Sequence, residues 1–138
     1  MFQLCSATGM MKLKNSGAKM EKSERLLFFI GALCGAVGVV LSAIAAHRTG
    51  GDLGTAASFL LIHAPALLIL SHRRFGNVQV VGAWTIVIGL ALFCGDLVAR
   101  AFLGIRLFPM AAPAGGVFLI GGWLLVALSA LLSRRGSA

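Results

Sequence analysis

The sequence predicts an all-α polytopic membrane protein in which four transmembrane helices form a compact bundle with both termini in the cytoplasm. Hydrophobic residues make up 59% of the 138-residue chain and charged residues only 12%, whereas soluble domains carry roughly 45–50% and about a quarter. A chain of this composition cannot cover itself with polar surface, so its outer face must meet lipid. The apolar residues also fall into four long runs, and each approaches the roughly 20 residues that cross a bilayer core about 30 Å thick.

The first run is the clearest of the four. It extends from Leu26 to Ala46 without a charged residue. The triplet Ala43-Ile44-Ala45 fits the cleavage pattern of a signal peptide, but signal-peptide cores are usually about 7–15 residues long, so an uncleaved helix is favoured. The predicted helices span about residues 26–46, 54–71, 76–100 and 112–133.

Local signals refine the second and third helices. Two glycines and an aspartate within residues 48–53 predict a turn before the second helix. Pro65 predicts a kink in that helix, because proline cannot donate to the carbonyl of Leu61. Asp96 and Arg100 are four residues apart with the acid first, which is the favoured order for a helical ion pair. The third helix is therefore expected to continue to about residue 101.

The positions of the charges predict the domain boundaries and the orientation. Residues 1–25 are mixed and basic and are interpreted as a disordered tail, residues 26–135 as the transmembrane domain, and residues 136–138 as a C-terminal tail. With four spans, nine Lys and Arg residues fall on the side of the termini and three on the other side, and the positive-inside rule then places both termini in the cytoplasm. The nine are Lys12, Lys14, Lys19, Lys22, Arg25, Arg73, Arg74, Arg134 and Arg135, and the three are Arg48, Arg100 and Arg106.

The same distribution bears on partners and localisation. A net charge of +8 could indicate nucleic-acid binding, but nearly every cation lies at the end of an apolar run, where cations meet lipid headgroups. The lipid bilayer of the bacterial inner (cytoplasmic) membrane is therefore the expected partner, and no nucleic acid is expected. Three scattered cysteines are too few for a disulfide framework or a metal clip.

Small residues recur on one side of the first predicted helix at intervals of four and three, so they share one face. Such a face lets two helix backbones approach closely in lipid. Helix packing is assigned to six residues on the first and fourth helices: Gly31, Gly35, Gly38, Ser42, Gly115 and Gly122. Trp84 and Trp123 each follow a pair of small residues and are expected to fill the space that these leave.

Four passages of the sequence match the motif order of a known family. They are residues 31–36 (GALCGA) with 42–47 (SAIAAH), residues 55–57 (TAA) with 63–68 (HAPALL), residues 92–97 (LFCGDL), and residues 113–116 (PAGG) with Gly122-Trp123. Together they resemble the membrane family catalogued as domain of unknown function 423, over roughly residues 26–132. The resemblance implies a four-helix membrane protein and no settled activity. The chain departs from the family pattern at Ser42 and Ala45, where glycine is favoured, at Pro65, where leucine is favoured, and at Asp96, where serine is favoured.

His63 is the candidate site within the membrane. It is placed about nine residues, or about 13 Å, into a helix entered from the outer side, and an ionisable group at such depth is a functional candidate. It could relay protons, ligate haem or hold a polar substrate. The structural alternative, which we favour, is a neutral imidazole bonded to the carbonyl that Pro65 frees or to Ser58.

Two further polar residues join this candidate site. His47 and Asp96 both fall at the outer ends of their helices and could meet, although Arg100 is the simpler partner for the carboxylate. The three histidines, which include His63 and His72, lie at different depths. A shared metal or haem site is therefore not expected, because metal ligands must converge to about 2 Å from the ion.

The sequence contains no Ser/His/Asp set, phosphate loop or metal-ligand spacing, so no enzymatic activity and no cofactor are expected. We interpret the chain as an accessory or structural subunit. It would dock through its small-residue helix faces onto a larger membrane complex, for example a respiratory or other bioenergetic complex, or onto itself. The alternative is a small transporter or proton-coupled carrier that uses His63. A haem or quinone protein is the third hypothesis.

Overall fold

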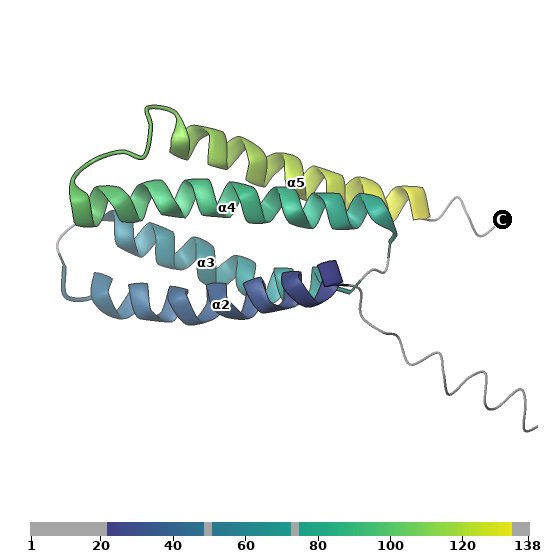
Figure 1. The fold of residues 1–138 in the computed structure, drawn as a ribbon, viewed down its shortest axis with the longest axis horizontal. Helices are drawn as coiled ribbons and strands as arrows, with labels where there is room; N and C mark the ends of the chain where they lie inside the picture. Colours follow the sequence, from purple (N-terminus) through teal and green to yellow (C-terminus); the bar gives the residue numbers. More distant parts are fainter. Residues whose placement is uncertain (1–21, 49–50, 73–74, 134–138) are drawn as a thin grey trace, which may run out of the picture.

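The computed structural model describes residues 22–48, 51–72 and 75–133 (Figure 1). Within these residues the secondary structure consists of helices, and each of the four is long and apolar enough to cross a membrane. The helices are α2 (Lys22–Ala45), α3 (Gly51–Leu70), α4 (Asn77–Leu103) and α5 (Ala111–Ser133). The predicted all-α class with four long apolar helices is confirmed. Residues 1–21 of the predicted N-terminal tail (residues 1–25) and the whole predicted C-terminal tail (residues 136–138) fall outside the described residues.

The helix boundaries differ from the predicted ones mainly at the starts. Helix α2 begins at Lys22, so its first turn takes in the charged residues that we assigned to the tail. The predicted turn over residues 48–53 was wrong in its second half, because α3 begins at Gly51 and carries Asp52 in its first turn. A carboxylate is favourable there, since the helix dipole is positive at its N-terminus. Helix α4 ends at Gly104, which has a φ of 68° and donates its N–H to the carbonyl of Arg100.

The helices run along one common axis as two antiparallel hairpins, α2–α3 and α4–α5 (Figure 1). Extensive packing joins α2 to α3, α3 to α4, and α4 to α5. We call the end with the α2–α3 and α4–α5 connections the loop end. The opposite end, where α2 begins and α5 finishes, is the terminal end.

Glycines of α2 set the spacing inside the first hairpin. A Cβ added at Gly31 would lie 3.1 Å from the Cβ of Leu67, and one at Gly38 would lie 2.9 Å from the Cγ of Leu61. At Gly35 the nearest atom would be 3.5 Å away, which is an ordinary contact. Ser42, which was also assigned to helix packing, is exposed and lies outside this contact. The closest part of this contact covers Gly31 to Gly38.

The second hairpin is closed by two reciprocal pairs of glycines. A Cβ at Gly115 would lie 2.8 Å from the carbonyl oxygen of Gly89, and a Cβ at Gly89 would lie 2.8 Å from the carbonyl oxygen of Gly115. Gly82 and Gly122 face each other in the same way at 3.0 Å. Each pair is separated from the next by seven residues on both helices, or two helical turns. The backbones of α4 and α5 therefore touch directly.

These contacts correct one part of the functional interpretation. Five of the six residues assigned to helix packing, all except Ser42, make their contacts within the chain. The glycines of these faces are thus occupied by the protein's own helices and are not free to dock a partner.

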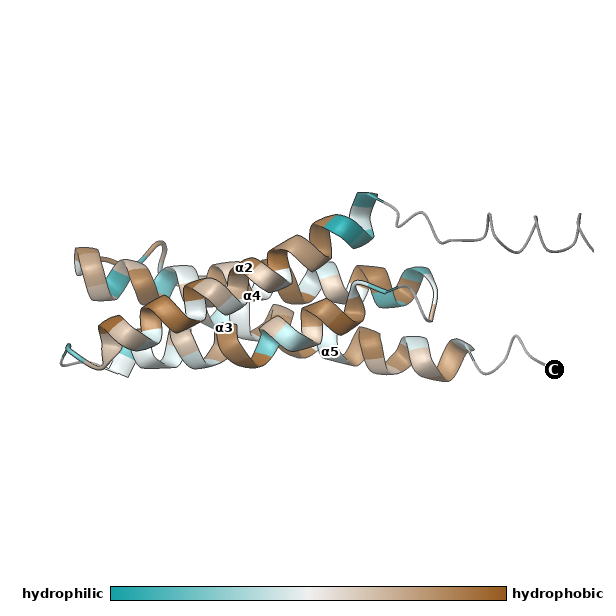
Figure 2. Ribbon diagram, turned by 90° about the horizontal axis from the view of Figure 1, so that it is seen from below, coloured by the Kyte–Doolittle hydropathy of each residue, from teal (hydrophilic) through white to brown (hydrophobic). Residues whose placement is uncertain are grey.

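The remaining helix surface is apolar and faces outward, mostly on α2 and α5, which are the least buried helices. Exposed side chains include Phe29, Val39, Val117 and Leu124. Figure 2 shows that hydrophobic colour covers most of the four helices and that the strongest hydrophilic colour lies at the start of α2. A surface of this kind matches lipid and would be unfavourable in water.

Candidate functional site

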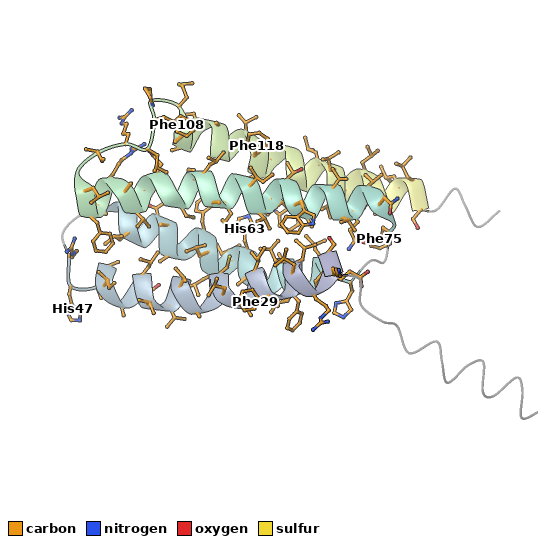
Figure 3. All side chains as sticks on the ribbon, viewed as in Figure 1. Phe29, His47, His63, Phe75, Phe108 and Phe118 are labelled. Carbon is orange, nitrogen blue, oxygen red and sulfur yellow. The ribbon has the colours of Figure 1, made fainter. Side chains whose placement is uncertain are left out.

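His63 lies inside the bundle, as Figure 3 shows, with 7% of its surface exposed. It is about 18 Å from Gly51 along α3 and about 10 Å from Leu70, at 1.5 Å per residue. Because α3 begins earlier than predicted, His63 is farther from the loop end of the bundle than the sequence indicated.

Both ring nitrogens of His63 have partners. Nδ1 is 2.8 Å from the carbonyl oxygen of Phe59, and the indole N–H of Trp123 donates to Nε2 over 3.3 Å. A carbonyl can only accept and an indole can only donate, so these partners fit a neutral imidazole with its proton on Nδ1. The sequence analysis favoured a neutral, hydrogen-bonded imidazole, and the observed bonds agree with that but involve different partners. The acceptor is Phe59 in place of the carbonyl of Leu61, and Ser58 donates to Gly54 instead.

Aromatic rings surround this imidazole. The ring of Phe59 stacks on it with centroids 5.9 Å apart and planes at 13°, and the Trp123 ring lies 6.1 Å away. Phe59 in turn packs against Phe93 of α4 at 4.6 Å. The cluster of Phe59, His63, Phe93 and Trp123 therefore joins α3 to both helices of the second hairpin.

A second indole forms a similar bond between the hairpins. The N–H of Trp84 on α4 donates to the hydroxyl of Ser23 on α2 over 2.9 Å. Each tryptophan of the second hairpin thus donates a hydrogen bond to the first hairpin, and we call these two contacts the indole bonds. The sequence predicted both tryptophans only as space-filling residues, because the partners are about 60 residues away along the chain.

Asp96 lies at the loop end and is fully buried. One carboxylate oxygen accepts from Arg100, as the four-residue spacing predicted, and the other accepts the backbone N–H of Leu107 over 2.9 Å. The Nε of Arg100 is buried without a hydrogen-bond partner among the described residues. Asp96 therefore fixes the α4–α5 connection to the end of α4.

His47 is exposed at the loop end and does not take part in this contact (Figure 3). The side chain that reaches α4 is its neighbour Arg48, which donates to the carbonyl of Ala101 over 3.3 Å and lies 4.7 Å from the centre of the Phe102 ring. In the structure, both oxygens of Asp96 are occupied by other donors. The three residues of the predicted polar site are thus separate: His63 in the bundle, Asp96 in a loop anchor and His47 at the surface.

Gln79 is a buried polar residue that the sequence analysis missed. Its side-chain oxygen accepts the N–H of Phe75 over 2.8 Å, and its nitrogen donates to the carbonyl of His72 over 2.9 Å. These bonds satisfy backbone groups of the α3–α4 connection. The sequence offered one signal for this role, which was a single glutamine near the start of an apolar run.

The buried polar side chains of the described residues bond to their own helix, to a connection or to a neighbouring helix. The five that are buried, His63, Ser71, Gln79, Asp96 and Ser129, are all hydrogen bonded. Among the residues with described positions, no three His, Cys, Asp or Glu side chains are grouped so that they could hold a metal ion. The arrangement is suited to fixing helices in place, and His63 is the buried histidine of the described residues.

Comparison with known proteins places the chain among bacterial membrane proteins. A family model described as "Protein of unknown function (DUF423)" matches residues 34–116. The UPF0382 membrane protein SH2409 of Staphylococcus haemolyticus is 30% identical over 116 residues, which cover 76% of this chain and 94% of the relative. The UPF0382 inner membrane protein YgdD of Escherichia coli is 28% identical over 126 residues, which cover 83% of this chain and 96% of the relative. No solved structure matches the chain.

Proposed function

Because the chain belongs to the DUF423 family of membrane proteins, we propose that it is a non-enzymatic accessory or structural subunit of the inner membrane that docks onto another membrane protein or onto itself. The proposal includes a larger bioenergetic complex, such as a respiratory complex, as a natural partner. The Escherichia coli relative is an inner membrane protein by name, which supports the membrane location. The docking role is our inference from the surface of the bundle.

The observation that carries the proposal is the outward face of α2. Ala32, Ala36 and Ala43 are exposed and share one side of the helix, together with the exposed side chains of Phe29 and Val39. Methyl-sized residues at intervals of four and seven allow close approach of another helix in lipid. These alanines are exposed beside the glycines that pack on α3, so the face is available while the bundle is closed.

The hydrogen bonding of the five buried polar residues among the described residues agrees with a role in assembly. The buried polar side chains described above are bonded to neighbouring backbone or side-chain atoms, and a catalytic site needs groups that can exchange such bonds for bonds to a substrate.

The experiment is to extract the protein from native membranes in a mild detergent and measure its native mass against the 14.3 kDa of one chain. We expect a larger assembly, and we expect Ala36→Leu to reduce it because the larger side chain keeps a partner helix at a distance. Ala91→Leu is the matched control. Ala91 is also exposed, and both residues lie about 21 Å along their helices from the terminal end. A monodisperse single chain without companions would contradict the proposal.

The orientation remains part of this proposal. The excess of cations on the side of the termini supports a cytoplasmic location for both. A reporter that works only in the cytoplasm, fused after Ala138, should be active, whereas activity of a periplasmic reporter at the same position would reverse the assignment.

A second function is supported by one observation, the buried imidazole of His63 between the two hairpins. In a small proton-coupled carrier, this group would exchange its bond to Trp123 for a proton or substrate during transport. The two hydrogen bonds of the His63 ring fit a single neutral state, and for that reason the docking role ranks first.

A flux assay in proteoliposomes tests this second function. Transport by the wild-type protein should be lost in His63→Ala and altered in Trp123→Phe, which removes the indole donor but keeps the imidazole. Equal flux in all three proteins would remove His63 from any transport mechanism.

A further inference from the structure

A cavity of about 140 Å³ lies where α2, α3 and α4 meet. Its floor is buried and consists of Leu60, Leu90 and Cys94. Its rim consists of residues that are exposed or only partly buried, from α2 on one side and α4 on the other: Ile30, Cys34, Val87, Ala91 and Gly95. The cavity therefore has a closed bottom and a mouth that opens between α2 and α4.

The mouth of the cavity exists because the close helix contacts lie within each hairpin and not between α2 and α4. Glycine contacts hold α2 to α3 and α4 to α5, but α2 and α4 belong to different hairpins and are not among the extensively packed pairs. On the facing side of α4, Ala91 and Gly95 contribute little volume. The space between α2 and α4 is thus left unfilled by the chain itself.

The position of the mouth along α2 and α4 indicates which part of the bilayer it faces. Cys34 is about 18 Å from the start of α2, a helix about 36 Å long, and Ala91 is about 21 Å from the start of α4, which is about 40 Å long. Both positions are near the midpoint of their helices and hence near the middle of the hydrocarbon layer. The molecules next to the mouth are the acyl chains of the lipids, and the rim is continuous with the lipid-facing surface of α2 and α4.

The lining excludes a polar ligand. Its side chains are aliphatic apart from two thiols, and the thiol of Cys94 is already 3.6 Å from the carbonyl of Ala56. An apolar cavity of roughly 150 Å³ holds one molecule the size of benzene, which corresponds to a short stretch of methylene groups. Lipid and protein interior are equally apolar, so the gain on filling comes from dispersion contacts that an empty cavity lacks.

From this geometry we propose that the cavity binds the end of one acyl chain of a bilayer phospholipid, which enters sideways between α2 and α4. The bound chain completes the contact between the two hairpins. The site does not depend on the docking role proposed above, because its mouth and the outward alanine face lie on different sides of α2.

The experiment uses the full chain in phosphatidylcholine vesicles that contain a phosphatidylcholine with a diazirine at the end of one acyl chain. After irradiation, mass spectrometry locates the lipid adducts. We expect the peptides with Cys34 and with residues 87–95 to carry at least about five times more adduct than exposed positions of equal depth on α5, because a chain held in a cavity stays in contact longer than one that diffuses past. Even labelling of all lipid-facing positions would overturn the proposal.

Two substitutions that fill the cavity sharpen the test. Ala91→Leu should lower the labelling at Cys34 at least about fivefold, because the larger side chain takes up the space, and Val87→Phe should do the same from the other part of the rim. Ala36→Leu, at the same depth on the opposite side of α2, should leave the labelling unchanged. Helix content by circular dichroism verifies folding of each variant. Unchanged labelling in both filled variants would overturn the proposal.

Discussion

The two hairpins are closed by glycine in different ways. In α4–α5 the glycines face each other, so a Cβ at Gly115 would meet the backbone nitrogen of Phe93 at 2.6 Å. In α2–α3 the contacts are looser: a Cβ at Gly31 would meet the Cβ of Leu67 and backbone atoms at no less than 3.1 Å, and the closest contact, at Gly38, is with the side chain of Leu61. A side chain can rotate away from an added methyl group, whereas a helix backbone cannot. The α4–α5 contact is therefore the fixed half of the bundle and α2–α3 the adaptable half.

The connections differ in the same sense. The α4–α5 connection is bound to its own hairpin through Asp96 and Leu107. At the end of α2, by contrast, Arg48 reaches across to Ala101 of the other hairpin. The end of α2 in the first hairpin is thus held in place partly by a contact with the second hairpin.

The largest expected effect comes from placing a methyl group between the backbones of α4 and α5. Gly115→Ala should destabilise the fold by about 3 kcal/mol, at the upper end of the cost of overpacking, because the helices themselves must separate. Unfolding in mixed micelles with increasing dodecyl sulfate, followed by circular dichroism, measures the change. A cost below about 1 kcal/mol would mean that the two hairpins do not differ as we describe.

A smaller effect is expected at the loop anchor. Asp96→Ala removes the acceptor for both Arg100 and the N–H of Leu107 and should cost about 2 kcal/mol, since buried groups lose their partner. Arg48→Ala, which removes an exposed contact of the first hairpin, should cost less than about 1 kcal/mol. The same unfolding assay compares the two variants, and equal losses would contradict the difference between the connections.

The indole bonds between the hairpins should contribute less. Trp123→Phe keeps an aromatic ring but removes the donor to His63, and hydrogen bonds between membrane helices are worth about 0.6 kcal/mol on average. A double-mutant cycle with His63→Phe should give a coupling energy of that size. A coupling near zero would show that the imidazole and the indole do not bind each other in the membrane.

The smallest effect is expected at Gly35, where an added Cβ would be 3.5 Å from the nearest atom. Gly35→Ala should leave stability unchanged or raise it by up to about 0.8 kcal/mol, because alanine favours the helix. The comparison with Gly115→Ala is direct, since the substitution is identical. Destabilisation by more than about 1 kcal/mol would show that α2 and α3 are as tightly constrained as α4 and α5.

The sequence was sufficient for features that depend on neighbours along the chain. Apolar run length predicts the four helices, and the four-residue spacing predicts the pair of Asp96 and Arg100. The charged residues before Leu26 concealed the true start of α2, because composition alone does not distinguish a helix turn outside the lipid from a tail.

Features that depend on the register between helices could not be predicted. Gly82 and Gly89 were not assigned to packing, although Gly115 and Gly122 were, because each pair becomes visible only when α4 and α5 are aligned. The same holds for the bond from Trp123 to His63, which joins residues 60 positions apart. Ser42 followed the helical spacing of Gly31 to Gly38, but spacing does not tell where one helix diverges from its neighbour.

The order of the indole bonds along the chain bears on biogenesis. Each hairpin contains its own close contact, so each can enter the bilayer from the ribosome as a two-helix unit. Ser23 can form its hydrogen bond once α4, which carries Trp84, has been inserted. His63 can form its bond to Trp123 only after α5 has been inserted. Until synthesis passes Trp123, the Nε2 of His63 therefore lacks its indole donor. Insertion of α5 completes this hydrogen bond.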